Sequence, residues 1–515
     1  MAKGKKKSSK KKKAAKKKVV EEKPAEEVAE EVPEEEVPEK EEEVAVEEKK
    51  EAPPKPAEPP KPAEVPKEKK RETPKGWEKE AVDETERLEF EDKFNKEKAF
   101  KHVESLTFPR KVGTEGEEKA ANYITGKFKE FGLTPVDEEF TFTHFVNEVL
   151  LRFFEGIEIG LILTALLLVS FLNPLTALRA GFIAGVIISI GIIVFSFYTS
   201  ITARFYYKFQ NTEGKIFKAI EYKSKNIIAK IDCTKGKDAA SGEVILMSHY
   251  DTKSQTWPMA LRATMFYINL LLSIIIPVGY ISLYMLILVG GGVNLVLFLG
   301  ILWGLAAGDV VTLVFLEFNR TGNESPGAID NASGLGVFLE LAENFAKDPL
   351  ENFNLTFVAT GAEELGLFGA ISFLKAHEAE LDPDDTYFLN LKIAAVRGHM
   401  YIPGPIGYPP RLPCLDIENL FKKTMKRRQI PRKEGSNRRL RVISPWVLTG
   451  SWNDDMIPVI RGFKANRVSI GGIRRRMDVI HTKNDTIDKV NIEAVDIVGK
   501  VTAEVLKRLD LRARP

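Results

Sequence analysis

The segment FVATGAEELG, at residues 357–366, runs from apolar residues directly into two adjacent carboxylates. Residues 355–359 predict a buried strand, because the stretch is short, mostly apolar and followed by a glycine. Glu363 and Glu364 then stand just beyond the end of that strand. Adjacent carboxylates point in different directions, so one can hold a metal ion while the other accepts a proton from water. The segment therefore predicts a strand with metal chemistry at its carboxyl end.

A second apolar stretch ends in a histidine and a carboxylate. The segment VILMSHYDT, at residues 244–252, predicts a strand over 244–247 followed by His249 and Asp251. Imidazole is a good zinc ligand, and a nearby carboxylate can accept its second N–H, which fixes the tautomer. This segment predicts a second strand end with metal-binding residue types.

Two later segments complete the set. GAIDNASGLG, at residues 327–336, places Asp330 before a glycine-containing turn into a helix, where a carboxylate can bridge two metals. VIHTKNDTIDKV, at residues 479–490, presents His481. Each motif alone is weak, because a histidine is more often structural and a glutamate pair is more often solvated. Together they contain two of the chain's six histidines, in order with carboxylates, and so indicate a zinc site.

Helical and strand patterns alternate through the polar parts of the chain. The predicted strands are 226–231, 244–247 and 355–359, and the predicted helices are 115–131, which ends at Gly132, and 336–345. Such alternation is typical of an α/β sheet domain.

Two long apolar regions interrupt this domain, from about Ile157 to Thr202 and from about Thr264 to Phe318. The first breaks at Asn173-Pro174 and the second at residues 290–292, which are all glycine. Each region is long enough for two helices of about 20 residues, and the breaks lie where a turn between antiparallel helices is needed. The sequence predicts four membrane spans in two hairpins, and the alternative is a set of buried core helices.

Basic residues near the ends of the apolar regions predict the orientation. On the side shared with the polar domain lie Arg152, Arg204, Lys208, Arg262 and Arg320. Among the hairpin turns only Arg179 is basic. The polar domain is therefore expected in the cytoplasm, with the membrane bilayer as a partner. The fourth span contains Asp309, which is either functional or paired with a neighbouring helix or a wet cavity.

The net charge of +2 hides an uneven distribution. Residues 1–75 contain a Lys block, a Glu-rich block and a Pro-rich block, and they have too few apolar residues to fold. This tail is expected to be solvated rather than bound to lipid, and no specific nucleic acid is expected because the chain shows no base-reading module. The cysteines, Cys233 and Cys414, stand apart and indicate neither a disulfide framework nor a Cys-rich zinc site.

The motifs resemble those of the co-catalytic zinc peptidases of the aminopeptidase Y type. Relatives of that family include glutamate carboxypeptidase II, glutaminyl cyclases and transferrin receptor. The segments that resemble the family, in chain order, are PRKVGTEGEEKAANYITGKFKEFGL (109–133), SKNIIAKI (224–231), HYDT (249–252), DNASG (330–334), GAEELG (361–366) and HTKNDTIDK (481–489).

The resemblance implies a three-layer mixed-sheet zinc-peptidase fold, here interrupted by the two hairpins. The expected divisions of the whole chain are a tail (1–75), a domain in three parts (80–150, 205–260 and 320–515) and hairpins (151–204 and 261–319). The tail and both hairpins lie outside the resemblance.

The resemblance also implies a role for each site residue. His249 would bind one zinc and Asp251 would orient it, while Asp330 would bridge two zincs. Glu364 and His481 would bind the second zinc. Glu363 would be the general base, and Glu363 and Asp251 are thus the expected catalytic residues. The implied reaction is hydrolysis of a peptide bond, usually at an N-terminal residue.

One position departs from the family pattern. In FLNLKIAAVRG, at residues 388–398, Lys392 stands where the family has a metal-binding Asp. A protonated lysine cannot bind zinc, so the expected content is one zinc, held by Asp330, Glu364 and His481, with two zincs as the alternative. Lys392 either occupies the vacated first site or turns away, and Asp385 or Asp454 are the candidate replacement ligands if two zincs bind.

Three functions fit these observations. The first is a membrane-embedded zinc peptidase that acts on peptide or protein substrates near the membrane. The second is a binding or scaffold protein on the same fold, and the third is a one-zinc acyl-transfer enzyme of the glutaminyl cyclase type. Zinc content together with a peptide-hydrolysis assay separates them.

Overall fold

The computed structural model describes residues 89–143, 220–406, 410–447, 453–471 and 478–512, with six scattered positions between 156 and 167. The charged tail predicted for residues 1–75 lies outside the described residues. The first predicted hairpin, residues 151–204, also lies outside them apart from those six positions.

An eight-stranded mixed sheet forms the centre of the described domain, in the order β1-β2-β6-β3-β7-β10-β8-β9. Its strands are β1 (Val136–Thr143), β2 (Glu221–Ile231), β3 (Gly242–His249), β6 (Phe353–Thr360), β7 (Thr386–Leu391), β8 (Met400–Tyr401), β9 (Val442–Ile443) and β10 (Lys464–Ile470). The four strands β6, β3, β7 and β10 are parallel neighbours, whereas β1, β2 and β8 pair antiparallel. Because the central strands are parallel, their carboxyl ends meet at one edge of the sheet, which is where ligands bind in open α/β sheets.

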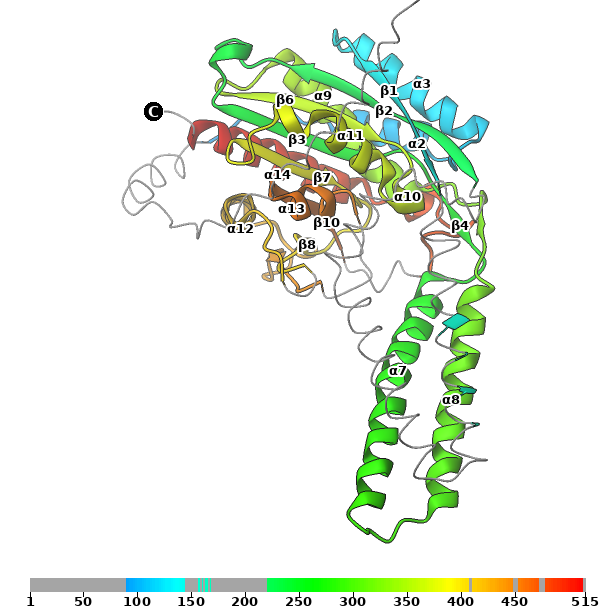
Figure 1. Cartoon of the computed structure of the whole chain (residues 1–515). Helices are drawn as coiled ribbons and strands as arrows, with labels where there is room; N and C mark the ends of the chain where they lie inside the picture. Colours follow the sequence, from blue (N-terminus) through cyan, green and yellow to red (C-terminus); the bar gives the residue numbers. More distant parts are fainter. Residues whose placement is uncertain are drawn as a thin grey trace, which may run out of the picture. The chain divides into compact units, whose positions relative to one another are not determined.

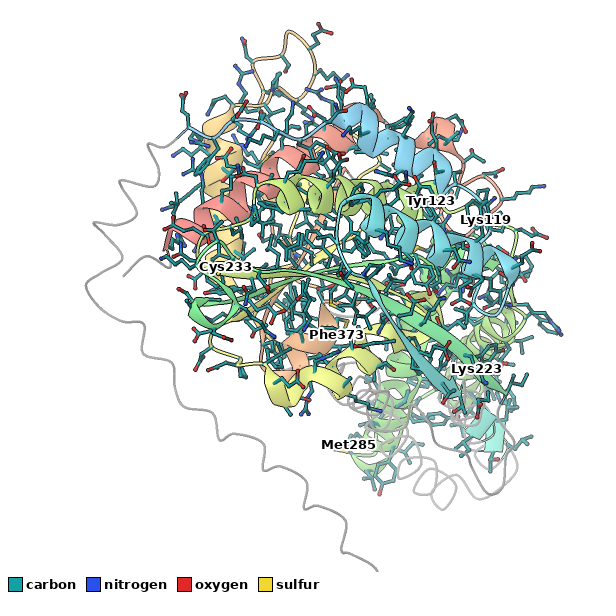
Figure 2. All side chains as sticks on the ribbon, turned by 90° about the horizontal axis from the view of Figure 1, so that it is seen from above. Lys119, Tyr123, Lys223, Cys233, Met285 and Phe373 are labelled. Atoms are coloured by element: carbon teal, nitrogen blue, oxygen red, sulfur yellow. The ribbon has the colours of Figure 1, made fainter. Side chains whose placement is uncertain are left out.

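Helices cover both faces of this sheet (Figure 1). The first face packs against α2 (Lys96–Ser105), α3 (Glu115–Glu130), α9 (Ser333–Lys347), α12 (Leu415–Arg428) and α14 (Ile492–Arg512). The second face packs against α10 (Glu363–Gly366), α11 (Phe368–His377) and α13 (Met456–Arg461). Figure 2 shows Tyr123 of α3 and Phe373 of α11 on opposite sides of the sheet. The α/β class and the three-layer mixed sheet predicted from the sequence are therefore confirmed.

The predicted elements agree with the observed ones in type and place. The strands expected at 226–231, 244–247 and 355–359 lie inside β2, β3 and β6. The helix expected over 336–345 lies inside α9, which begins earlier at Ser333. The apolar residues of β3 from Val244 to Met247 are all buried, because a central parallel strand is covered on both faces. Short helical segments, η2 (Lys237–Ala239), η3 (Ala328–Ala332), η4 (Glu378–Glu380) and η6 (Ile487–Lys489), lie in the connections.

Two long apolar helices are inserted between β3 and α9: α7 (Met259–Leu288) and α8 (Leu295–Glu317). They lie side by side (Figure 1), with Ile276, Tyr280 and Leu283 packed against the facing helix. The turn between them uses Gly290 at φ +69°, a conformation that suits glycine. Their most apolar windows have mean hydropathies of 2.3 and 2.0 and are only 28% and 22% buried. By length and composition both helices can cross a membrane.

The sequence predicted four spans, whereas the described residues contain only this one hairpin. The position and the glycine turn of the second predicted hairpin agree with α7 and α8. Within it, the buried Asp309 accepts a hydrogen bond from Asn269 Nδ2 at 2.8 Å. This contact across the two helices agrees with the neighbouring-helix interpretation of Asp309.

At the base of the hairpin, the two-stranded sheet of β4 (Ser254–Gln255) and β5 (Thr321–Gly322) joins the two chain segments that enter and leave it. Trp257 stacks on Phe315 of α8, with ring centroids 4.4 Å apart. The hairpin is therefore attached to the chain directly after the carboxyl end of β3.

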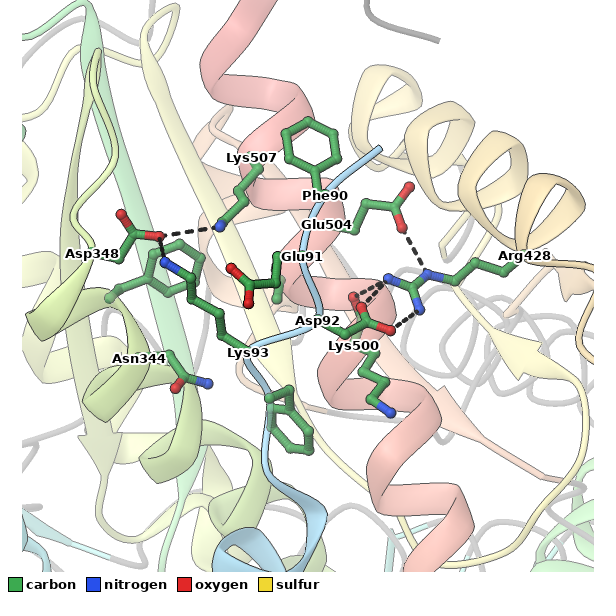
Figure 3. Close-up of a pocket in the computed structure, with 13 residues that line it drawn as sticks. Phe90, Glu91, Asp92, Lys93, Asn344, Asp348, Arg428, Lys500, Glu504 and Lys507 are labelled. Carbon is green, nitrogen blue, oxygen red and sulfur yellow. Dashed lines mark hydrogen bonds and ion pairs between the residues drawn. The ribbon is translucent and has the colours of Figure 1, made fainter. Parts of the chain in front are cut away.

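The first described residues are held against the carboxyl-terminal helix (Figure 3). Asp92 accepts hydrogen bonds from Arg428 Nη1 and Nη2 at 3.1 and 2.6 Å, and Arg428 Nε donates to Glu504 at 2.7 Å. The hollow beside these residues has a volume of about 20 Å³. The side chains around it form a structural ion-pair network that ties residues 89–94 to α12 and α14.

Candidate metal centre

The predicted site residues gather at the carboxyl edge of the central strands. His249 ends β3, the Glu363–Glu364 pair follows β6, and Lys392 follows β7. Asp330 lies in η3, just before α9, and His481 lies in the loop before η6. All of these side chains are buried. Parallel strands bring together residues that are more than a hundred positions apart in the chain.

Three of these side chains converge on one point. The candidate ligand atoms of Asp330, Glu364 and His481 all lie within 4.8 Å of one another. His481 Nε2 is 3.0 Å from Glu364 Oε1 and 3.5 Å from Asp330 Oδ2. Three protein ligands of these types are the set that is typical of catalytic zinc.

The hydrogen bonding of this triad tests whether it suits a cation. Glu364 Oε1 and His481 Nε2 are both buried and have no well-aligned hydrogen-bond partner among the described residues. A buried polar atom without a partner is costly, so such atoms are usually satisfied. Glu364 Oε1 and His481 Nε2 can each offer a lone pair to the same cation, so one metal ion would satisfy both atoms. The residues present therefore fit a zinc ion held by Asp330, Glu364 and His481.

Lys392 points into the centre rather than away from it. Its Nζ lies 2.7 Å from His249 Nε2, 2.7 Å from Glu363 Oε1 and 3.3 Å from Asp330 Oδ1. Burial alone would lower the pKa of Lys392, but the carboxylates of Asp330 and Glu363 outweigh it and raise this pKa. The lysine is therefore an ammonium ion that lies among the residues expected to form the first metal site.

This ammonium sets the role of His249. A lysine ammonium can only donate, so His249 Nε2 must accept across the 2.7 Å contact. The ring then carries its proton on Nδ1, which lies 3.2 Å from the backbone oxygen of Asp251. The Nε2 lone pair of His249 is thus used in the contact with Lys392. His249 is not part of the Asp330, Glu364 and His481 triad.

Asp251 contacts the glutamate pair as well as His249. The resemblance implied that its carboxylate orients His249, and its Oδ1 lies 3.4 Å from His249 Nδ1. The carboxylate also accepts the backbone N–H groups of Glu363 at 3.1 Å and Glu364 at 3.0 Å. Asp251 therefore fixes the backbone of the glutamate pair, and the orientation of His249 is a secondary contact.

Asp485 was not singled out from the sequence, although it lies in the same motif as His481. Its carboxylate accepts the backbone N–H groups of Ile329 at 2.6 Å and Asp330 at 3.2 Å. Burial raises the pKa of Asp485 to about 7. Arg110 supports the chain near Asp330 as well. Its buried side chain donates hydrogen bonds to the backbone oxygens of Tyr250 and Pro326.

Two further basic residues beside the triad were also missed. Lys253 Nζ lies 3.0 Å from Glu364 Oε2 and donates to the Glu364 backbone oxygen at 2.7 Å. Burial would raise the pKa of Glu364, but His481 and Lys253 hold it below its usual range. Arg262, in the first turn of α7, has Nη2 3.4 Å from His481 Nδ1. The base of the hairpin therefore reaches the metal centre.

The two candidate replacement carboxylates lie elsewhere. Asp385 is exposed, and its backbone oxygen accepts the N–H of Glu243 near the start of β3. Asp454 is buried, and its Oδ2 accepts a hydrogen bond from Thr360 at 2.6 Å. Burial raises the pKa of Asp454 to about 7, and the charge of Glu363 adds to this effect. Neither residue belongs to the converging triad.

Comparisons with known proteins find a matching family model, a partly similar protein and several similar structures. Residues 314–506 match the model of peptidase family M28. The alkaline phosphatase isozyme conversion protein of Escherichia coli (strain K12) is 36% identical over 93 residues, which is 18% of this chain and 27% of that protein. The match thus spans about a quarter of the relative's length.

Several solved aminopeptidases are similar in structure at low identity. An aminopeptidase from Aneurinibacillus sp. strain AM-1 is 15% identical with a TM-score of 0.44, over 80% of this chain and 93% of the other. A zinc aminopeptidase from Bacillus subtilis is 13% identical with a TM-score of 0.42, over 81% and 96%. A glutaminyl cyclase from Bacteroides thetaiotaomicron is 13% identical with a TM-score of 0.42, over 80% and 98%. The residues that match the model of family M28 include Asp330, Glu364 and His481, the converging triad.

Proposed function

We propose that the chain is a membrane-anchored, zinc-dependent peptidase of the aminopeptidase type that works with a single zinc ion. The observation that carries this proposal is the convergence of three buried candidate ligands, Asp330, Glu364 and His481, whose ligand atoms all lie within 4.8 Å of one another. The match to family M28 supports peptide hydrolysis as the reaction and a peptide or protein as the substrate.

In this proposal Asp330, Glu364 and His481 hold the zinc. When bound, zinc acidifies water and polarises a carbonyl group. Glu363 accepts the proton of the attacking water and later returns it to the leaving amine. Glu363 is suited to this role because Asp251 fixes its backbone and its neighbour Glu364 belongs to the triad that would hold the zinc.

Lys392 has two proposed effects on the base. Its ammonium, 2.7 Å from Glu363 Oε1, favours the ionised carboxylate that a general base requires. It also places a positive charge at the point where the family pattern has an Asp that binds the first metal. A fixed charge there stabilises negative charge that develops on a substrate carbonyl oxygen.

Replacing His481 by Ala is expected to abolish tight zinc binding and peptide hydrolysis together. The natural protein should contain about one zinc per chain, because three ligands and an open position are the catalytic arrangement. Metal analysis of the purified protein and hydrolysis of N-terminal aminoacyl substrates provide the two measurements. His377 is a matched control, since it pairs with Glu138 at 2.7 Å away from the triad, and its Ala variant should keep both properties.

Other combinations of results contradict the proposal. Zinc binding without hydrolysis of any peptide would favour the acyl-transfer or binding functions. A natural protein that binds no zinc would leave the binding or scaffold function as the better one.

The membrane part of the proposal is that α7 and α8 cross the bilayer and that the domain faces the cytoplasm. In support, the most apolar windows of both helices are largely uncovered by the described domain. Arg262 and Arg320 flank the hairpin on the domain side, where cytoplasmic basic residues are expected. The active site would then lie at the membrane surface, because Arg262 at the base of α7 contacts His481.

Cysteine labelling tests this orientation. A membrane-impermeant maleimide added to intact cells should label a Gly292→Cys variant but not a Lys223→Cys variant. A side chain at Gly292 meets no atom within 4 Å, and Lys223 is exposed on β2. The background is small because Cys233 and Cys414 are both buried. Labelling of Lys223→Cys alone would show the opposite orientation, and labelling of both in intact cells would exclude a membrane barrier between them.

A further inference from the structure

A strongly basic loop follows α12. Residues 430–441 fold back on themselves, with Arg432 N–H donating to the Arg438 backbone oxygen at 2.7 Å and Leu440 N–H to Ile430 at 2.8 Å. Leu440 is buried in the main core, which anchors the loop. The backbone of the loop is therefore held in a hairpin-like shape, and its basic side chains are exposed.

Two adjoining cavities lie beside this loop, with volumes of about 910 and 690 Å³. They share His399, Arg432 and Arg438. The basic side chains that line one or both are Arg397, Arg432, Lys433, Arg438, Arg439 and Arg441, against the two acidic residues Glu434 and Glu493. This volume exceeds what a small inorganic ion needs, and its lining is predominantly cationic.

Most of the basic residues that line these cavities have no acidic partner in the part of the chain that the structure describes. Within the described ranges no carboxylate forms an ion pair with Arg432, Lys433, Arg438, Arg439 or Arg441. Glu493, the one acidic lining residue that forms ion pairs, is already shared by Lys96 and Arg397. Burial lowers the pKa of His399, and the charges of Arg432 and Arg441 lower it further. These basic side chains are exposed and so are free to meet an anion, and guanidinium groups match phosphate oxygens in geometry.

Some residues that line the cavities lie at the same edge of the sheet as the metal centre. His399 precedes β8, whose Met400 pairs with Ile470 at the carboxyl end of β10. The chain leaves for α7 shortly after the carboxyl end of β3, and β3, β7 and β10 run parallel. An anion in the cavities would therefore lie on the side of the domain from which the hairpin departs.

We propose that the two cavities beside residues 430–441 bind the phosphate of an anionic lipid headgroup. A cationic site on the membrane-facing edge of a cytoplasmic domain meets such headgroups directly, and each basic residue there adds to the attraction. The phosphate chemistry rests on the cavities alone. The choice of a lipid over a soluble phosphate ester rests on the proposed membrane attachment.

A titration of the full-length protein in neutral detergent tests this proposal. The probes are phosphatidylglycerol in mixed micelles and, separately, glycerol 1-phosphate, with native mass spectrometry as the readout. Phosphatidylglycerol should bind saturably, and the combined Arg432→Ser, Arg438→Ser and Arg441→Ser variant should bind it at least about tenfold more weakly. A matched variant removes the same charge elsewhere, at the exposed residues Lys101, Lys129 and Lys223, and should bind as the natural protein does.

Each other outcome overturns a stated part of the proposal. Equal loss in both variants would show a net-charge effect and no site, and equal binding by all three proteins would show that the cavities take no lipid. Glycerol 1-phosphate binding as tightly as phosphatidylglycerol would exclude the lipid as the specific ligand. Zinc content and hydrolysis are measured on the same preparations, so a failure of the proposed enzyme function is seen separately from a failure of the phosphate site.

Discussion

A Glu363→Gln variant is expected to lose about 10²- to 10⁴-fold in kcat/KM while its zinc content stays at the natural level. Glu363 lies next to a triad ligand but is not itself one of the three converging residues. Its backbone is held by Asp251 through a 3.1 Å hydrogen bond that the substitution does not remove. A carboxamide has the same shape as the carboxylate but cannot accept the proton of the attacking water. Metal analysis and steady-state kinetics on one preparation give both values.

The variant is designed to leave the geometry unchanged. The carboxamide oxygen can still accept the hydrogen bond that Lys392 Nζ donates over 2.7 Å. Glu340 provides a matched control, because it is a buried glutamate that accepts the Asn95 N–H at 3.1 Å, outside the metal centre. Its Gln variant should be fully active. If Glu363→Gln kept most of its activity, another group would have to be the base, and if it lost zinc, Glu363 would be a ligand.

The sequence predicted the sheet and most of the centre because both depend on local patterns. Short apolar runs that end in glycine and charged residues predicted β3 and β6, and the central position of these strands makes their residues apolar throughout. His249 and Glu364 could be expected near each other because parallel strands place their carboxyl ends at one edge. The glycine run at 290–292 likewise predicted the turn between α7 and α8.

Contacts that depend on packing between distant segments were not predictable. The Asp251 carboxylate could orient His249 or hold the glutamate backbone, and only the fold decides that it mainly does the second. Arg262 looked like a flanking charge of a membrane span, but its position in the first turn of α7 brings it to His481. Nothing in the sequence indicates this, because the two residues are 219 positions apart.

The sequence also left open whether the Lys392 side chain occupies the first metal site or turns away from it, and the fold decides this. The surrounding charges explain it: burying Asp330 and Glu363 without a cation would leave two carboxylates desolvated and unpaired, at a cost of several kcal/mol. The Nζ at 3.3 and 2.7 Å from these two carboxylates removes that cost. The lysine therefore takes over the charge-balancing part of a metal ion at this position without its ability to bind a substrate oxygen through an open coordination position.

A Lys392→Asp variant is accordingly expected to raise the zinc content from about one to about two per chain. The substitution removes the ammonium that contacts His249 Nε2. It adds a carboxylate at the position where the family that the motifs resemble has a metal ligand. His249, Asp330 and the new carboxylate would then form a second ligand set. Without metal the same variant should unfold more easily, by roughly 3–5 kcal/mol, because its buried carboxylates lose their cation. Metal analysis and thermal unfolding with and without zinc measure these two effects.

The Lys392→Met variant distinguishes a new ligand from a mere loss of repulsion. It also removes the ammonium and frees His249, but it supplies no oxygen. If the added carboxylate is what binds, Lys392→Met should keep about one zinc while Lys392→Asp binds about two. Two zincs in both variants would show that His249 and Asp330 suffice once the positive charge is gone. Two zincs already in the natural protein would contradict the one-metal centre, and would require Lys392 to leave the position 2.7 Å from His249 that it occupies here.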